Sequence, residues 1–175
     1  MKRILSILLL CMVLPAGVFA IGIYGGVNAY YDNLIQPADL TAIDTAGLNL
    51  ADFSFGGEVR LIVGPLWGSA VGIYTPADAN LSNRVDLLLD GGLGLSLGFV
   101  RAGIGIGPNF GFEFGDNATN FFKTGANLRL TGDVLLGPLS LGLSWISRVE
   151  FTRDSIVDAF LNPYGQIGVA ALYRF

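Results

Sequence analysis

Carboxylate and guanidinium groups stand two residues apart at three places in this sequence: Glu58 and Arg60, Arg84 and Asp86, and Arg148 and Glu150. In an extended strand, residues two apart point to the same side, so both members of each couple face the same surroundings. Opposite charges held in this way form ion pairs, which matter most where water is scarce. Such pairs need strands that place them together on one sheltered surface.

Histidine is absent from the sequence, and the one cysteine is Cys11. Ser–His and Asp–His catalysis use His as the proton carrier near neutral pH, so these enzyme classes are excluded. The usual transition-metal ligands are also missing, and we expect no metal or other cofactor. The glycines from Gly103 follow the spacing G-x-G-x-G with no helical pattern after them, which argues against a phosphate loop. We predict a non-enzymatic protein, with a hydrolase built from carboxylates alone left open.

The hydrophobic residues alternate with other residues along most of the chain. They make up 52% of the sequence and charged residues only 14%, yet no apolar run after residue 20 reaches the roughly 20 residues of a membrane helix. The clearest example is "FVRAGIGIGPNFGFEF" at residues 99–114, in which Ile104 and Phe110 share one face and Arg101 and Glu113 the other. A period of two indicates a β-strand and excludes a helical face.

Eight segments with this alternation are predicted, at residues 21–31, 52–63, 66–75, 84–97, 99–114, 122–136, 139–151 and 164–175. Segments of about ten residues with one apolar and one polar face are typical of membrane barrels. We therefore predict an all-β fold, an eight-stranded antiparallel up-and-down transmembrane β-barrel with its apolar face outward. The phase of residues 66–75 is ambiguous, and we assign Trp67, Val71 and Ile73 to the outside. A soluble barrel with the apolar face inward stays an alternative.

The first residues have the order of a secretory signal. Lys2 and Arg3 precede an apolar stretch over residues 4–14, and a small-residue cleavage site follows it. This order predicts a cleaved signal peptide over residues 1–20 and a single outer-membrane barrel domain over residues 21–175. Acylation of Cys11, as in a lipoprotein, is the alternative for this segment.

The predicted connections alternate between short and long. Short turns fall at Gly64–Pro65, at Gly98 and at Gly137–Pro138, and longer loops at residues 32–51, 76–83, 115–121 and 152–163. Outer-membrane barrels have tight periplasmic turns and longer outer loops, so both termini are predicted to be periplasmic. The long loops are rich in Asp, and we expect a host or envelope ligand, if there is one, at loops 32–51 and 152–163.

The inward faces of the predicted strands hold thirteen charged residues: Glu58, Arg60, Arg84, Asp86, Asp90, Arg101, Glu113, Lys123, Arg129, Asp133, Arg148, Glu150 and Arg174. The interior of an eight-stranded barrel is just wide enough to be filled by side chains. Seven positive and six negative groups in that space nearly neutralise one another, so we predict a salt-bridged plug. A narrow ion path is the alternative.

The signal segment, the eight alternating segments and the terminal "VAALYRF" resemble the small outer-membrane barrels of the OmpA/OmpX type. The resemblance implies that Tyr173 and Phe175 form the C-terminal assembly signal, although Ala170 and Gly168 depart from the usual pattern. It also implies outer-membrane lipid and the assembly machinery of a diderm bacterium as partners. The OmpW type, proposed to pass small hydrophobic compounds, is the second resemblance.

These observations predict a structural or surface-interaction barrel of the outer membrane, with a plugged lumen, acidic outer loops and no nucleic-acid partner. The alternative is a small pore, or an OmpW-like channel for small solutes or hydrophobic compounds. A charged interior suits a hydrophobic ligand poorly, which favours the plugged barrel.

Overall fold

The computed structural model describes residues 21–35, 52–77, 82–115, 118, 121–150 and 165–175, without the side chains of residues 32–35 and 150. The predicted signal peptide over residues 1–20 lies outside these ranges, and so do most of loops 32–51 and 152–163. In the described ranges no helix is long and apolar enough to cross a lipid bilayer.

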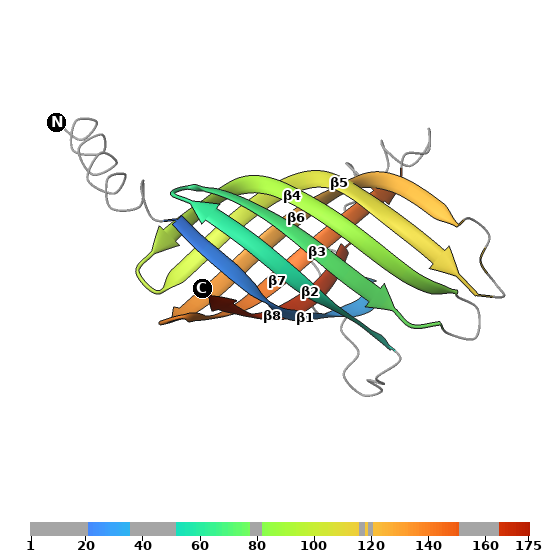
Figure 1. Ribbon diagram of the computed structural model, residues 1–175, viewed down its shortest axis with the longest axis horizontal. Coiled ribbons are helices and arrows are strands. Elements are labelled where there is room, and N and C mark those ends of the chain that lie inside the picture. The colour runs from blue at the N-terminus through green and yellow to red at the C-terminus, as the bar shows by residue number, and fades with distance from the viewer. Residues whose placement is uncertain (1–20, 36–51, 78–81, 116–117, 119–120, 151–164) are drawn as a thin grey trace.

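Eight antiparallel strands form a closed barrel in which each strand pairs with the next and the last pairs with the first (Figure 1). The strands are β1 (Ile21–Ile35), β2 (Phe53–Val63), β3 (Leu66–Thr75), β4 (Asn83–Leu97), β5 (Val100–Phe114), β6 (Phe122–Leu136), β7 (Leu139–Glu150) and β8 (Gly165–Arg174). The start of β1 and the end of β8 lie at the same end of the barrel, where Tyr24 is paired with Arg174. The predicted fold class is confirmed.

The register of the strands fixes the shape of the barrel. From Ile21, successive paired residues lead through all eight strands and return to β1 at Tyr31, ten residues further along. With a rise of about 3.3 Å per residue and about 4.8 Å between strands, this offset tilts the strands by about 40° from the barrel axis. The interior is then a narrow tube whose contents are the inward-facing side chains.

The short turns at one end of the barrel follow from three glycines. Gly64, Gly98 and Gly137 each begin a two-residue turn and have φ values of 60°, 62° and 66°. Two of these turns continue with Pro65 and Pro138, whose rings hold φ near −65°. Glycine with positive φ at the first position is the mark of a type II′ turn, which matches the twist of the strands it joins.

The predicted inward and outward faces agree with the structure in most strands, and β3 is the exception. Trp67, Val71 and Ile73 were assigned to the outside, but they face the lumen with exposed fractions of 6%, 0% and 1%. The outward face of β3 carries Gly68, Ala70 and Gly72 instead. Both faces of this strand are mainly apolar, so Ser69 on the inward face was the one weak indication of which face lies inside. Trp145 of β7 keeps its outward phase, but it is buried over Gly165.

Trp67 points inward because the next two strands, β4 and β5, leave room for its ring. A Cβ atom built on Gly105 would lie 2.6 Å from the Trp67 ring, and one built on Gly103 would lie 3.0 Å from its Nε1. A Cβ atom built on Gly94 of β4 would lie 3.4 Å from the same ring. The lumen-facing glycines of β4 and β5 thus form the surface on which the indole packs.

This packing predicts that Gly105→Ala destabilises the barrel. The new methyl group would collide with the ring, and overpacking of this kind costs about 1–3 kcal/mol. Urea unfolding of the refolded protein, followed by the mobility of the folded form on unheated gels, measures the change. Gly91→Ala is the control, because a Cβ built there meets nothing within 4 Å, and equal losses for the two variants would contradict the packing.

Candidate functional site: the ionic lumen

Arg129 of β6 is the central cation of the lumen. Its Nη2 lies 2.5 Å from Glu58 Oε2, and its Nη1 lies 3.3 Å from Asp90 Oδ2. The side chains of all three residues are 0% exposed. Carboxylates buried this completely are tolerated only when they are paired and hydrogen-bonded. Arg129 therefore neutralises one carboxylate from β2 and one from β4.

Arg60 of β2 extends this network to a third carboxylate. Its Nε lies 2.7 Å from Glu58 Oε1, and its Nη1 lies 2.6 Å from Asp133 Oδ2. The five groups form one chain, in the order Asp133, Arg60, Glu58, Arg129 and Asp90, which we call the central network. It ties β2, β4 and β6 together through the middle of the tube.

Neutral side chains complete the central network. Ser69 donates a hydrogen bond of 3.1 Å to Asp90 Oδ2, and the Asn127 amide donates to Asp90 Oδ1. Both guanidinium groups lie over the Trp67 ring, with Arg60 Cζ 5.5 Å and Arg129 Cζ 5.9 Å from its centroid. An aromatic face attracts cations, so the indole supports the arginines as well as filling space.

A second set of charges lies nearer the end of the barrel that carries the long loops. Asp86 of β4 accepts from Arg84, at 2.8 Å, and from Arg148 of β7, which also donates to Gln166 of β8. We call these four residues the outer network. Lys123 and Glu113 form a separate pair of 2.7 Å close by, and the Lys123 side chain is 25% exposed.

An apolar layer separates the two networks. Along the inward face of β4, Asp90 of the central network is followed by Leu88 and then by Asp86 of the outer network. Leu88 belongs to a buried cluster with Tyr30, Val71, Ile73 and Ile146. A second buried cluster, of Tyr24, Ile62, Trp67, Ala170 and Leu172, lies toward the end with the short turns. The described lumen is therefore filled by alternating apolar and ionic layers.

Three of the thirteen predicted lumen residues form no described ion pair. Arg101 lies directly opposite Asp133 in the ladder. However, Arg101 donates to Ser96 Oγ at 3.0 Å and stacks over Tyr24 at 5.8 Å, because Asp133 is paired with Arg60. Arg174 donates to the Ile21 carbonyl at 3.3 Å. The side chain of Glu150, the expected partner of Arg148, is not described.

Sequence reasoning missed Trp67 and Ser69 as parts of this site. Both lie on the inward face of β3, whose phase was assigned wrongly. The serine was the available signal, because Ser69 is the one strongly polar side chain between Trp67 and Ile73 and so marks the lumen face.

At the end of β8, Tyr173 and Phe175 are exposed, and their rings lie 5.7 Å apart.

Several buried polar atoms in the described part of the lumen make no protein hydrogen bond. They are both amide atoms of Asn28, Tyr30 Oη, Asn127 Oδ1, Arg129 Nε and Ser144 Oγ. These residues come from β6, β7 and β1, which together with β8 form one continuous part of the barrel wall. Buried polar atoms of this kind are often hydrogen-bonded to internal water.

The chemistry available in the lumen is electrostatic. Every carboxylate of the two networks is paired with a guanidinium group. Among the described residues, no cluster of three or more His, Cys, Asp or Glu side chains is placed to hold a metal ion.

Comparison with known proteins identifies the architecture. No family model matches the sequence, and no curated protein matches it. The crystal structure of the N-terminal β-barrel domain of Pseudomonas aeruginosa OprF is similar, with a TM-score of 0.61 over 90% of this chain and 98% of that one. The two sequences are 9% identical, so the likeness extends to the fold alone.

The geometry predicts that Arg129→Met strongly destabilises the barrel. Removing one partner of a buried ion pair costs about 3–5 kcal/mol, because the charges left behind stay buried. Lys123→Met is the matched control and should cost less than about 1 kcal/mol, since its pair is partly exposed.

The double variant Asp90→Asn/Arg129→Met should recover part of the loss, because it also removes Asp90, the carboxylate whose described ion pair is with Arg129 alone. The gel-based urea titration measures all three variants. A loss for Arg129→Met no larger than that for Lys123→Met would contradict the central network.

Proposed function

We propose that the chain is a non-enzymatic integral outer-membrane β-barrel with a closed lumen, serving envelope structure or surface interaction. The observation that carries the proposal is the contrast between the two faces of one wall. Ile104, Ile106 and Leu143 are 51%, 62% and 62% exposed on the outside, whereas Arg129 and Asp86 are 0% exposed within. This distribution suits a barrel surrounded by hydrocarbon and filled by paired charges.

Aromatic residues support the membrane location. The rings of Phe112 and Phe122 lie 5.2 Å apart near the end of β5 and the start of β6, and those of Tyr31 and Phe53 lie 5.6 Å apart at the same end of the barrel. Tyr173 and Phe175 lie at the opposite end. Rings at both ends of an apolar belt match the aromatic girdles of membrane barrels.

The orientation follows from the turns. The three two-residue turns lie at the end that holds both ends of the barrel domain, which we assign to the periplasm. The longer connections would then face outward with their Asp residues, among them Asp39, Asp44, Asp154 and Asp158. A ligand of the outer surface, if it is bound through these loops, would be cationic.

A small pore is the second candidate. The buried polar atoms of Asn28, Tyr30 and Ser144, which make no described hydrogen bond, favour it, because they would suit a file of water along one side of the lumen. The apolar cluster around Tyr30 and Leu88 opposes it, because it crosses the lumen between the two networks.

The location predicts that the protein is recovered in outer-membrane fractions and migrates differently on gels before and after heating. A closed barrel keeps its compact form in cold detergent and loses it on boiling. Recovery in the soluble periplasmic fraction would contradict the proposal.

Closure of the lumen predicts no persistent conductance steps when the purified barrel is added to a planar lipid bilayer. The two ionic networks and the apolar layer occupy successive levels of the described lumen, which favours a closed interior. A protein with Leu88→Gly, which opens the apolar layer, is the comparison. Steps of defined size from the wild type would select the pore instead.

A further inference from the structure

Two arginines at the end of the barrel with the short turns have no described carboxylate partner. Arg101 near the start of β5 and Arg174 at the end of β8 both lie at this end, where β1 begins (Figure 1). Arg101 is half-buried and Arg174 is exposed. Neither forms an ion pair with a described carboxylate. This mouth of the lumen therefore carries two positive charges that the ionic networks do not balance.

Tyr24 of β1 brings the two arginines together. It lies directly opposite Arg174 in the ladder between β1 and β8, so both side chains point to the same, inward side of the wall. The Arg101 Cζ atom lies 5.8 Å from the centroid of the Tyr24 ring. A Cβ atom built on Gly22 would lie 3.5 Å from Arg174 Nε and 2.8 Å from Tyr24 Cε2. The two guanidinium groups are therefore neighbours of one aromatic ring.

Most N–H groups of these arginines remain available for a further partner. Asp133 lies opposite Arg101 in the ladder, but its carboxylate is paired with Arg60. Each arginine forms one described side-chain hydrogen bond, Arg101 from Nε and Arg174 from Nη2. A guanidinium group has five N–H donors, so the larger part of each fork is free of described hydrogen bonds.

An apolar floor limits how far a ligand can enter the lumen from this mouth. Along the inward face of β8, Arg174 is preceded by Leu172 and Ala170, which belong with Tyr24 to one buried cluster. Tyr24 is 6% exposed and Leu172 is 1% exposed. A charged ligand would lose its hydration on entering this cluster and gain no hydrogen bond there, so it would stay beside the arginines.

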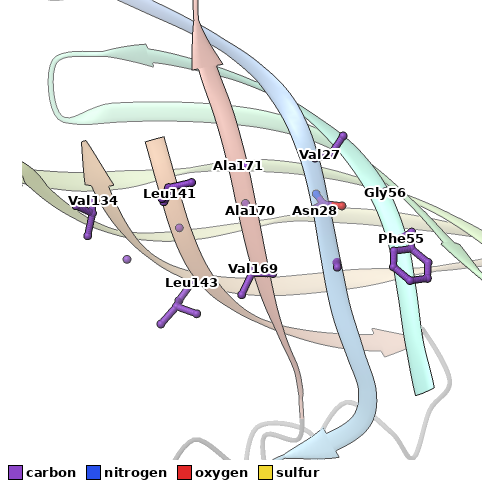
Figure 2. A pocket seen from close by; sticks show the side chains of 13 residues that line it. Val27, Asn28, Phe55, Gly56, Val134, Leu141, Leu143, Val169, Ala170 and Ala171 are labelled. Atoms are coloured by element: carbon purple, nitrogen blue, oxygen red, sulfur yellow. The ribbon is translucent and has the colours of Figure 1, made fainter. Parts of the chain in front are cut away.

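The mouth is separate from the hollow on the outer wall. Figure 2 shows that hollow, an apolar groove with Leu141 and Leu143 of β7 toward one end and Phe55 of β2 at the other. No charged residue lines the groove, and Arg174 lies on the lumen side of the wall. The groove therefore takes no part in a site for a charged ligand.

We propose that Arg101, Arg174 and Tyr24 form a binding site for one phosphate dianion, carried by a soluble phosphate monoester. The two guanidinium groups balance the charge of about −2 that a phosphate monoester carries near neutral pH, whereas a carboxylate would balance only one of them. Guanidinium forks also match phosphate oxygens through charge-assisted hydrogen bonds. The Tyr24 ring keeps Arg101 in place, because an aromatic face attracts a cation.

The position of the site favours a soluble ligand over a lipid headgroup. Both arginines lie on the lumen side of the wall, whereas lipid would surround its outer side. With the orientation proposed above, this mouth opens to the periplasm, which would supply the ester.

Calorimetric titration of the barrel folded in octyl glucoside, an uncharged detergent, tests the site. The probes are glycerol 3-phosphate and acetate, each added at the same low ionic strength. The wild type should bind one glycerol 3-phosphate with an affinity at least fivefold higher than that for acetate. Equal affinities would overturn the assignment to a dianion, and no binding of glycerol 3-phosphate at millimolar concentration would overturn the site.

Two substitutions with a matched control locate the ligand. Arg101→Gln and Arg174→Gln should each lower the affinity for glycerol 3-phosphate at least fivefold, and Arg174→Lys should recover part of it. Lys123→Gln removes a partly exposed cation at the other end of the barrel and should bind as the wild type does. An equal loss for Lys123→Gln would reduce the effect to net charge and overturn the site, and so would unchanged binding by both arginine variants.

NMR spectra of the wild type give a second measurement that does not depend on the folding of any variant. The side-chain Nε–H signals of Arg101 and Arg174 should shift during the titration, whereas that of the buried Arg129 should not. Shifts confined to Arg129 would overturn the site.

Phosphatidylglycerol added to the micelles distinguishes the two sources of phosphate. It should not displace glycerol 3-phosphate, and displacement would assign the site to a lipid headgroup and overturn the soluble ligand. A barrel that folds in detergent but binds no glycerol 3-phosphate overturns this inference and leaves the proposed function standing, because fractionation and heating test that function separately.

Discussion

The pairing of β8 with β1 is the constraint on which the rest of the molecule depends. A sheet with free edges would leave rows of backbone N–H and C=O groups without partners, and closing the sheet satisfies them. Closure with an offset of ten residues also sets the tilt of the strands, and the tilt sets the width of the interior. Once that width is fixed, the inward residues must fill it.

The filling explains why charge and glycine occur together on the inward faces. The side chains of Arg129, Arg60 and Trp67 are large. Because all three lie at one level of the lumen, the residues around them must be small. Gly103 and Gly105 supply that room, which is why the segment 99–114 alternates glycine with large apolar residues. The carboxylates neutralise the arginines. Ser69 and Asn127 donate hydrogen bonds to the two carboxylate oxygen atoms of Asp90.

Much of this architecture follows from the sequence, and the limits have physical reasons. The strands were predictable because a polar and an apolar face alternate, and their ends because Gly–Pro turns stop them. β3 was assigned the wrong phase because most of its inward side chains are apolar and Ser69 is the one polar side chain between Trp67 and Ile73. The partners in the networks were also beyond local reasoning. Arg129 is paired in the ladder with Gly105 and Ile146, yet its charge is balanced by Glu58 and Asp90 from other strands.

The apolar layer between the two networks gives the barrel a graded response to its medium. Dissolved ions can approach Arg84, whose side chain is 24% exposed, and weaken its pairing with Asp86 by screening. They cannot approach Arg129, which lies behind Leu88 and its neighbours. Concentrated salt would thus weaken the ion pairs at this end of the barrel while the central network stays intact, so the two networks differ in their sensitivity to ionic strength.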